Sequence, residues 1–274
     1  METTEIRARK AITPRMPKFA FEHVPKHWLF NSPLASAVAN GVNLLFPAGE
    51  RFFIRSVQHY MDSISDAELK KQIKGFFGQE GRHAGAHEKY FDRMRQHGFD
   101  VDGLLKSYEH LAFDIIEKAS PPILRLSVTV ALEHFTAIMA EKAFTDRVLD
   151  NADPAMRDLL YWHASEEIEH KAVAFDVLKA VDPRYSVRVA GMLLGSTLLG
   201  GFWFWATLRL LREDKDFPSK SSAADVGQIA AERIDFIRKV FVGGIWDYLR
   251  PSFHPNDKDT SKLAETYLAS VGLA

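Results

Sequence analysis

The residues of this chain that could do chemistry are glutamates and histidines at a repeated spacing. In the stretch QEGRH, Glu80 is followed three positions later by His83. In the stretch EEIEH, Glu167 is followed by His170 at the same spacing. On a helix, side chains three positions apart project from one face, one turn apart. A carboxylate and an imidazole placed in this way are two donors that can hold one metal ion.

Four glutamates each occupy the middle of an apolar stripe with helical spacing. They are Glu50, Glu80, Glu133 and Glu167. Their apolar neighbours, in the same order, are Val42, Phe46, Phe53 and Val57; Leu69, Ile73, Phe76, Ala84, Phe91 and Met94; Leu126, Val130, Ala137, Ala140 and Phe144; and Leu160, Ala164, Ala174 and Leu178. Because the apolar stripe of a helix faces the core, we expect four helices to point one glutamate each inward.

Four buried carboxylates need compensating charge. Burying a bare carboxylate is costly, and mutual repulsion would raise the pKa values until some groups became protonated. Two divalent cations balance four carboxylates when both histidines are neutral. Oxygen and imidazole donors without thiolate suit iron or manganese and tolerate zinc. We therefore predict two Fe ions, with Mn as an option and Zn less favoured, on these ligands: Glu50, Glu80, His83, Glu133, Glu167 and His170. The four glutamates are also our candidate catalytic residues.

The order of these residues indicates a pseudo-repeat of two helical hairpins. The single glutamates are 83 residues apart, and the Glu-x-x-His pairs are 87 apart. One Glu from each of two helices and Glu-x-x-His from the other two is the ligand set of di-iron and di-manganese carboxylate bundles. Solvated glutamates and capped histidines are the alternative, but this alternative poorly explains four carboxylates on apolar faces.

Two further histidines lie near the predicted ligands. His87 follows His83 by one turn, and the resulting H-x-x-x-H lacks the glutamate of the zinc motif H-E-x-x-H. His163 precedes Glu167 by one turn. We predict that both bind the cofactor, His87 as an extra ligand or the partner of one, and His163 by orienting a ligand. Packing is the alternative for each.

The surrounding sequence predicts an all-α chain. No stretch alternates convincingly with period two, and helical periodicity recurs with capping residues and prolines at its boundaries. Pro47 should kink or break the first helical run. The expected helices cover residues 31–61, 65–97, 103–118, 120–149, 153–181, 189–208 and 224–249, with a short terminal helix. The predicted organisation is an arm at 1–30, a four-helix bundle with a dimetal centre at 31–185, an apolar helix at 186–212 and a C-terminal helical extension at 213–274.

One segment has two interpretations. Residues 189–208, VAGMLLGSTLLGGFWFWATL, carry no charge, and about twenty apolar residues can span a bilayer as a helix. Gly191 and Gly195 form a small-xxx-small pair that brings helices close together in lipid. The segment therefore predicts either membrane insertion or a central buried helix.

Composition narrows the function classes. The 274 residues include no cysteine, which excludes disulfides, thiolate ligands and cysteine nucleophiles. Net charge is −1, and no basic block predicts nucleic-acid binding. No G-x-S-x-G motif supports a serine hydrolase. The first twenty residues lack the apolar core of a signal peptide, so we expect a cytoplasmic protein, with association at the inner membrane as an option through 189–208. A homodimer is the default expectation for assembly.

The motifs FPAGERFF, QEGRHAGAHEKY, ALEHFTA and WHASEEIEHKAVAFDV resemble those of the ferritin-like di-iron superfamily. More closely, they are similar to a bacterial family described as predicted metal-dependent hydrolases, over roughly residues 30–250. The resemblance implies a ferritin-like helical bundle with a dimetal centre. All six ligand positions match the di-iron pattern, and His87 is an addition to it.

Three functions fit this site. Our main expectation is an oxidoreductase that uses O2 as co-substrate to oxidise, hydroxylate or desaturate a hydrophobic or lipid-like substrate. The alternative is a metal-dependent hydrolase with a metal-bridged hydroxide as nucleophile, which would retain activity with zinc. Iron storage in a shell is a third option, although ferritins are shorter and lack a charge-free segment of this length.

Overall fold

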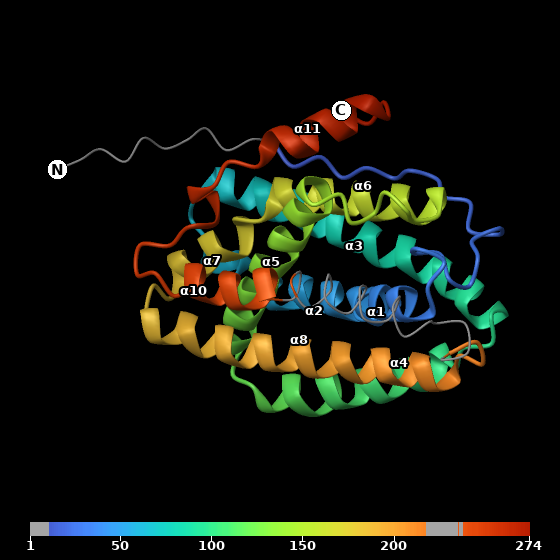
Figure 1. Cartoon of the computed structure of the whole chain (residues 1–274). Coiled ribbons are helices and arrows are strands. Elements are labelled where there is room, and N and C mark those ends of the chain that lie inside the picture. Colours follow the sequence, from blue (N-terminus) through green and yellow to red (C-terminus); the bar gives the residue numbers. More distant parts are fainter. Residues whose placement is uncertain (1–10, 218–234, 236–237) are drawn as a thin grey trace.

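The structure, a computed structural model, describes residues 11–217, 235 and 238–274. Within this part the regular elements are helical and no strand is found, which confirms the all-α class. One isolated bridge joins Leu29 and Ala152. The elements are α1 (Pro33–Asn43), α2 (Phe46–Gln58), η1 (Met61–Ser63), α3 (Ala67–Gln96), α4 (Val101–Glu109), η2 (His110–Glu117), α5 (Pro122–Thr145), α6 (Pro154–His170), α7 (Val173–Val181), α8 (Tyr185–Glu213), η3 (Arg238–Gly243), α10 (Gly244–Tyr248), η4 (Pro255–Asp257) and α11 (Ser261–Ser270) (Figure 1).

Local signals set where the long helices begin and end. The Asp66 carboxylate accepts hydrogen bonds from the backbone of Glu68 and Leu69 and caps α3. Asp153 caps α6, which then starts with a proline. Gly98 follows α3 with a φ of 91°, the left-handed conformation that commonly ends a helix. These caps set the ends of α3 and α6, and the apolar stripe of each helix decides which side chains face inward.

The structure confirms one expected helix boundary and changes another. The first run breaks before Pro47, as predicted, into α1 and α2. The run expected at 153–181 is instead two helices, α6 and α7, separated at Lys171 and Ala172. No proline or glycine lies at this break, and the helical periodicity continues across it, so the sequence contains no signal for it. The expected helix at 224–249 lies partly outside the described residues, and its described remainder is η3 and α10.

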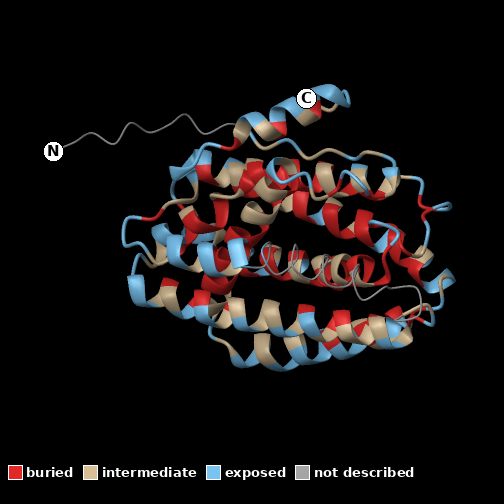
Figure 2. Cartoon of the chain, viewed as in Figure 1, coloured by how far each residue is buried: buried red, intermediate tan, exposed pale blue. Residues whose placement is uncertain are grey.

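Four helices pack in a closed ring. Helix α2 contacts α3, α3 contacts α6, α6 contacts α5, and α5 contacts α2. Helix α8 packs on α5 and α1, while α11 packs on α6 at the opposite side of the molecule (Figure 1). Buried residues are concentrated on the ring helices, and the outward sides of α4 and α8 are exposed or intermediate (Figure 2). The ring therefore gives any inward side chain a dry environment.

Helix α8 contains the charge-free segment. By length and composition alone, α5 and α8 could each cross a membrane, with 56% and 28% of their most apolar windows buried. A Cβ atom at Gly191 would lie 2.0 Å from Ser127 Oγ of α5, so this glycine lets the two helices touch. The small-xxx-small pair thus acts within the chain. On the other side of α8, Leu193 and Phe204 are 61% and 67% exposed.

Ile12 and Pro14 of the N-terminal arm lie directly on α3. A Cβ atom at Gly75 would approach the carbonyl oxygen of Ile12 to 2.6 Å, and one at Gly78 would approach Pro14 Cγ to 2.4 Å. Only glycine allows the arm this close to the helix. This contact places Thr13 beside Gln79 of α3 and Arg15 beside Glu166 of α6.

Candidate metal centre

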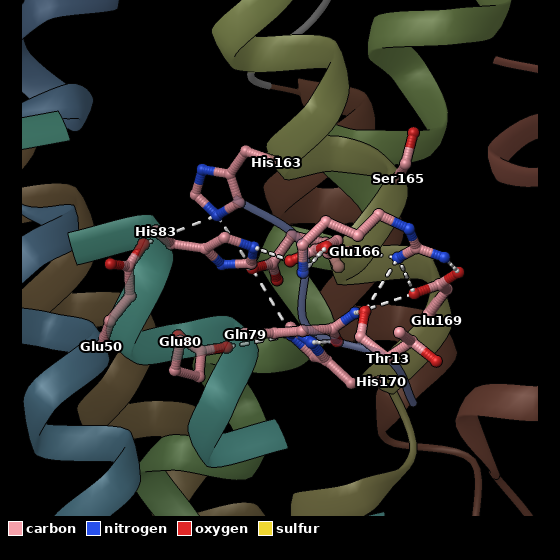
Figure 3. A network of polar contacts seen from close by, with 12 residues as sticks. Thr13, Glu50, Gln79, Glu80, His83, His163, Ser165, Glu166, Glu169 and His170 are labelled. Carbon is pink, nitrogen blue, oxygen red and sulfur yellow. Dashed lines mark hydrogen bonds and ion pairs between the residues drawn. The ribbon is translucent and has the colours of Figure 1, made fainter. Parts of the chain in front are cut away.

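The ring brings all six predicted ligands together. Glu50 comes from α2, Glu80 and His83 from α3, Glu133 from α5, and Glu167 and His170 from α6. Each is buried, with an exposed fraction of at most 4%. Figure 3 shows several of these side chains pointing toward one another from their separate helices.

One group of potential ligands contains three carboxylates and one imidazole. Glu80, Glu133, Glu167 and His170 each place one donor atom within 4.8 Å of the others. His170 Nε2 lies 3.0 Å from Glu80 Oε1 and 3.5 Å from both Glu133 Oε2 and Glu167 Oε1. This group has the number and type of donors for one metal ion.

A second group lies beside the first. Glu50, His83 and His163 place their donor atoms within 4.8 Å of one another. His163 Nε2 is 3.5 Å from Glu50 Oε1 and 2.9 Å from Glu167 Oε1, while His83 Nδ1 is 3.6 Å from the same Glu167 oxygen. Glu167 therefore lies between the two groups. We expected His163 to orient a ligand, but its Nε2 atom lies among the donor atoms of this group, so His163 is itself a candidate ligand.

The residues present fit two metal ions. In the described part of the chain, most buried side-chain atoms without a hydrogen-bond partner belong to the six predicted ligands. They include both carboxylate oxygens of Glu50, Glu80 and Glu133. Buried polar atoms in native proteins are almost always satisfied, so a cluster of unsatisfied ones needs a reason. Cations between the carboxylates supply that reason.

The far side of each imidazole is held by a partner. His83 Nε2 lies 2.9 Å from Glu166 Oε2, and His170 Nδ1 lies 2.9 Å from Gln79 Oε1. His163 Nδ1 lies 2.7 Å from His87 Nε2, so His87 is the partner of a candidate ligand. Since metal-binding imidazoles use one nitrogen for the metal and one for such a partner, these contacts aim the remaining nitrogens inward.

An outer polar network, which the sequence did not lead us to expect, supports these partners. The Arg15 guanidinium donates to Glu166 Oε1 at 3.2 Å and to Glu169 Oε2 at 2.7 Å. Gln79 Nε2 donates to Glu169 Oε2 and to the backbone oxygen of Thr13. Figure 3 shows this network beside His170. One signal was present in the sequence: a glutamine or glutamate directly precedes each motif glutamate, at positions 79 and 166.

Burial and like charge disfavour ionised carboxylates here. Burial, with Glu80, Glu167 and Glu133 nearby, raises the pKa of Glu50 well above its ordinary value. Burial also raises the pKa of Glu133 well above that value, despite the opposing charge of His170. Burial, with the Glu167 charge, raises the pKa of Glu80 to about 7. The cluster therefore favours protons or metal ions over bare anions.

In two members of the cluster, Glu167 and His170, the pKa is shifted so that the charged form is favoured. Burial alone would raise the pKa of Glu167, but the charge of His170 and the hydrogen bond from His163 outweigh it and hold this pKa well below its ordinary value. Burial would lower the pKa of His170, but Glu167 and Glu133 outweigh it and raise this pKa well above its usual range. Burial, followed by the charge of His163, lowers the pKa of His83 well below its usual value, which suits a neutral ligand.

Two apolar cavities reach the cluster. The first, which we call the η2 cavity, has a volume of about 100 Å³ and lies among α2, η2, α5 and α8, with Glu50 in its wall. The second, the α1 cavity, has a volume of about 140 Å³ and lies among α1, α5 and α6, with His163 and Glu167 in its wall. Apolar cavities next to a few polar groups are typical of small-molecule sites.

A third acidic group lies elsewhere. His27, Asp214 and Asp216 place donor atoms within 4.8 Å of one another. The Lys26 ammonium group already lies 2.5 Å from Asp214 Oδ1, and His27 Nε2 lies 2.8 Å from Asp214 Oδ2. The lysine supplies the positive charge that a metal would bring, so this group is an ion-pair cluster.

Comparison with known proteins bears on the activity. A family model described as predicted metal-dependent hydrolase matches residues 13–259, a span that contains every candidate ligand. This finding contradicts our main expectation of an O2-dependent oxidoreductase, which was wrong, and supports the alternative. No curated protein and no solved structure matches the chain. The chain belongs to the family of predicted metal-dependent hydrolases.

Proposed function

We propose that this protein hydrolyses an apolar substrate with two divalent metal ions held in a ferritin-like dimetal bundle. The observation that carries the proposal is the cluster of buried, unsatisfied carboxylate and imidazole atoms at the inner ends of two apolar cavities. Family membership supports hydrolysis as the reaction.

The two groups of donors would each hold one ion. Glu80, Glu133 and His170 would hold the first. Glu50, His83 and His163 would hold the second, and Glu167 lies within reach of both groups. The donors favour iron or manganese and accept zinc. When bound, such ions polarise the scissile group and lower the pKa of a water molecule so that it can attack.

The chain's own groups would position the substrate and manage protons. Tyr108 lines the η2 cavity together with Glu50. Burial raises the pKa of Tyr108, so its hydroxyl keeps its proton, which is directed at the backbone oxygen of Leu45 3.5 Å away; a substrate oxygen would have to replace this long contact. The Thr136 hydroxyl, which lines both cavities, donates to the backbone oxygen of Glu133 and so steadies the ligand-bearing turn of α5.

The proposed substrate class follows from the cavity walls. In the η2 cavity, side chains such as Phe52, Phe113 and Leu199 face the space beside Glu50. A strongly polar substrate would lose its hydration against these apolar walls and find few hydrogen-bond partners, which is costly. A hydrophobic or lipid-like substrate is therefore favoured, and the exposed apolar side of α8, with Leu193 and Phe204, offers a route for delivery from a membrane.

The test is hydrolysis with a redox-inert metal. Metal-depleted protein is reconstituted with Zn²⁺, Mn²⁺ or, without oxygen, Fe²⁺, and assayed against a panel of apolar esters, amides and phosphoesters. We expect turnover with Zn²⁺ in the absence of O2, lost in Glu133→Ala and retained in Glu141→Ala. Glu141 lies on the same helix but pairs with Lys258, away from the cluster. Two bound Zn²⁺ ions per chain with no hydrolysis of any panel member would contradict the proposal.

A further inference from the structure

We infer that the η2 cavity and the α1 cavity are two arms of one bent channel, so that the substrate carries an apolar chain on each side of the reacting bond. The inference that this bond is hydrolysed rests on the proposed function. The inference that the site has two arms rests on the cavities alone.

The arms end at the same place. The η2 cavity reaches the cluster at Glu50, and the α1 cavity reaches it at His163 and Glu167. Glu50 Oε1 and His163 Nε2 are only 3.5 Å apart. A molecule that extends along both arms would therefore place its middle against the candidate metal ligands.

The two arms share a wall. Four residues line both cavities: Val42, Phe46, Thr136 and Met139. Val42 and Phe46 come from α1 and α2, and Thr136 and Met139 come from α5. These four residues form the partition between the two cavities. The Phe46 ring centre lies 4.8 Å from that of His163, which places the partition in front of the cluster. Phenylalanine and methionine side chains can rotate without movement of the backbone, so a substrate can pass between them.

Both arms suit hydrocarbon. Among the described residues that line the α1 cavity, the polar side chains other than the Trp203 indole are Thr136 and the two candidate ligands. The indole N–H of Trp203 is itself satisfied by the backbone oxygen of Val38. The η2 cavity has polar lining at Tyr108 and at Glu117, Ser120 and Arg125, and is otherwise apolar apart from Glu50 and Thr136. A sugar, peptide or nucleotide would bury polar groups without partners in the α1 cavity, and in the η2 cavity Glu117, Ser120 and Arg125 are already engaged with Arg55 or with backbone oxygens.

The experiment measures binding of ketones that mimic an ester without being cleaved. Undecan-6-one carries two pentyl chains, and heptan-2-one carries one pentyl chain and a methyl group. Each buried methylene strengthens binding about fourfold, so we expect the two-chain ketone to bind the zinc-loaded full chain at least tenfold more tightly by isothermal titration calorimetry.

A matched pair of substitutions blocks one arm each. Ala39→Phe fills the α1 cavity, and Ala112→Phe fills the η2 cavity, at half-buried helical positions that line one cavity only. In each variant the dissociation constants of the two ketones should lie within about threefold of each other. Ala119→Phe, at an exposed position outside both cavities, should leave the tenfold difference in affinity intact. A difference that survives either blocking variant would overturn the inference.

A second readout does not depend on these variants. Trp203 lines the α1 cavity. Undecan-6-one brominated at one chain end should quench tryptophan fluorescence in the unmodified chain and quench it less in Trp203→Phe; equal quenching would overturn the inference. Tight binding of the two-chain ketone without hydrolysis of the matching ester would overturn the hydrolase proposal and leave the two-armed site standing.

Discussion

Replacing Glu80 by glutamine should change the stability of the metal-free protein in a way that depends on pH. Glu80 is fully buried, and its pKa is raised from 4.5 to about 7. Below pH 4.5 the carboxyl group is protonated in both folded and unfolded chains and costs nothing. As the pH rises to about 7, the unfolded chain loses this proton while the folded chain keeps it, so the folded state loses stability. The glutamine variant carries no such penalty.

The magnitude follows from the same shift. One pKa unit corresponds to about 1.4 kcal/mol, so the glutamate costs about 3 kcal/mol at pH 8 and about 1 kcal/mol at pH 5. The buried amide of the variant costs about 1–3 kcal/mol for an unmade hydrogen bond, but equally at both pH values. The free energy of unfolding of Glu80→Gln, relative to the unsubstituted chain, should therefore be about 2–3 kcal/mol higher at pH 8 than at pH 5.

Urea unfolding of chelator-treated protein at both pH values measures this difference. Glu88→Gln is the matched control, because Glu88 lies two turns further along α3 and forms an exposed ion pair with Arg51. Its effect should stay below about 1 kcal/mol at either pH. A relative stability of Glu80→Gln that does not change with pH, or that falls at pH 8, would mean that His170 fully compensates the Glu80 charge. The argument that the cluster needs metal for charge balance would then be refuted.

Three further outcomes are expected. Glu167→Ala should reduce the metal content from two ions per chain to below one, whereas Glu50→Ala should leave one, by elemental analysis; equal losses would contradict the placement of Glu167 between the groups. Metal affinity, measured by chelator competition, should strengthen as pH rises through about 7, by up to roughly tenfold per pH unit for each proton displaced, because Glu80 must ionise to bind; a flat profile would contradict its raised pKa. Leu193→Ser with Phe204→Ser should weaken co-sedimentation with phosphatidylcholine vesicles, and an unsubstituted chain that stays in the supernatant would argue against the membrane-delivery route.

The helices that carry the candidate ligands were predictable because their signal is local. Each stripe around Glu50, Glu80, Glu133 and Glu167 repeats at helical spacing, so burial of the carboxylate follows from the phase of its helix alone. The structure buries all four. The break between α6 and α7 lacked such a signal, since Lys171 is an ordinary helix-forming residue.

Long-range contacts were not predictable in this way. Arg15 reaches Glu166 across 151 positions of sequence, and only the close approach of the arm to Gly75 and Gly78 makes the contact possible. The reaction was not predictable from the ligands either. The same donors serve oxygen chemistry and hydrolysis, so spacing could identify a metal site without choosing between them, and the family match contradicted the choice we made.

The pseudo-repeat explains how two short motifs build one centre. Gln79 and Glu166 each lie four positions before the histidine of their own motif, on the same helical face. Because α3 and α6 pack face to face, each of these residues meets the histidine of the opposite motif: Gln79 holds His170, and Glu166 holds His83. In this structure neither motif orients its own imidazole, so the candidate ligands are aligned only once α3 and α6 have packed together.

The repeat is broken in a way that should make the two proposed metal positions inequivalent. His83 turns Nε2 to a carboxylate and Nδ1 to the cluster, whereas His170 turns Nδ1 to an amide and Nε2 to the cluster. A carboxylate partner raises the basicity of an imidazole more than a neutral amide does. The two groups also differ in composition. The group with Glu50, His83 and His163 has two imidazoles and one carboxylate, whereas the group with His170 has three carboxylates and one imidazole. Two different ions, or one ion that binds substrate and one that activates water, fit this asymmetry better than two interchangeable ones.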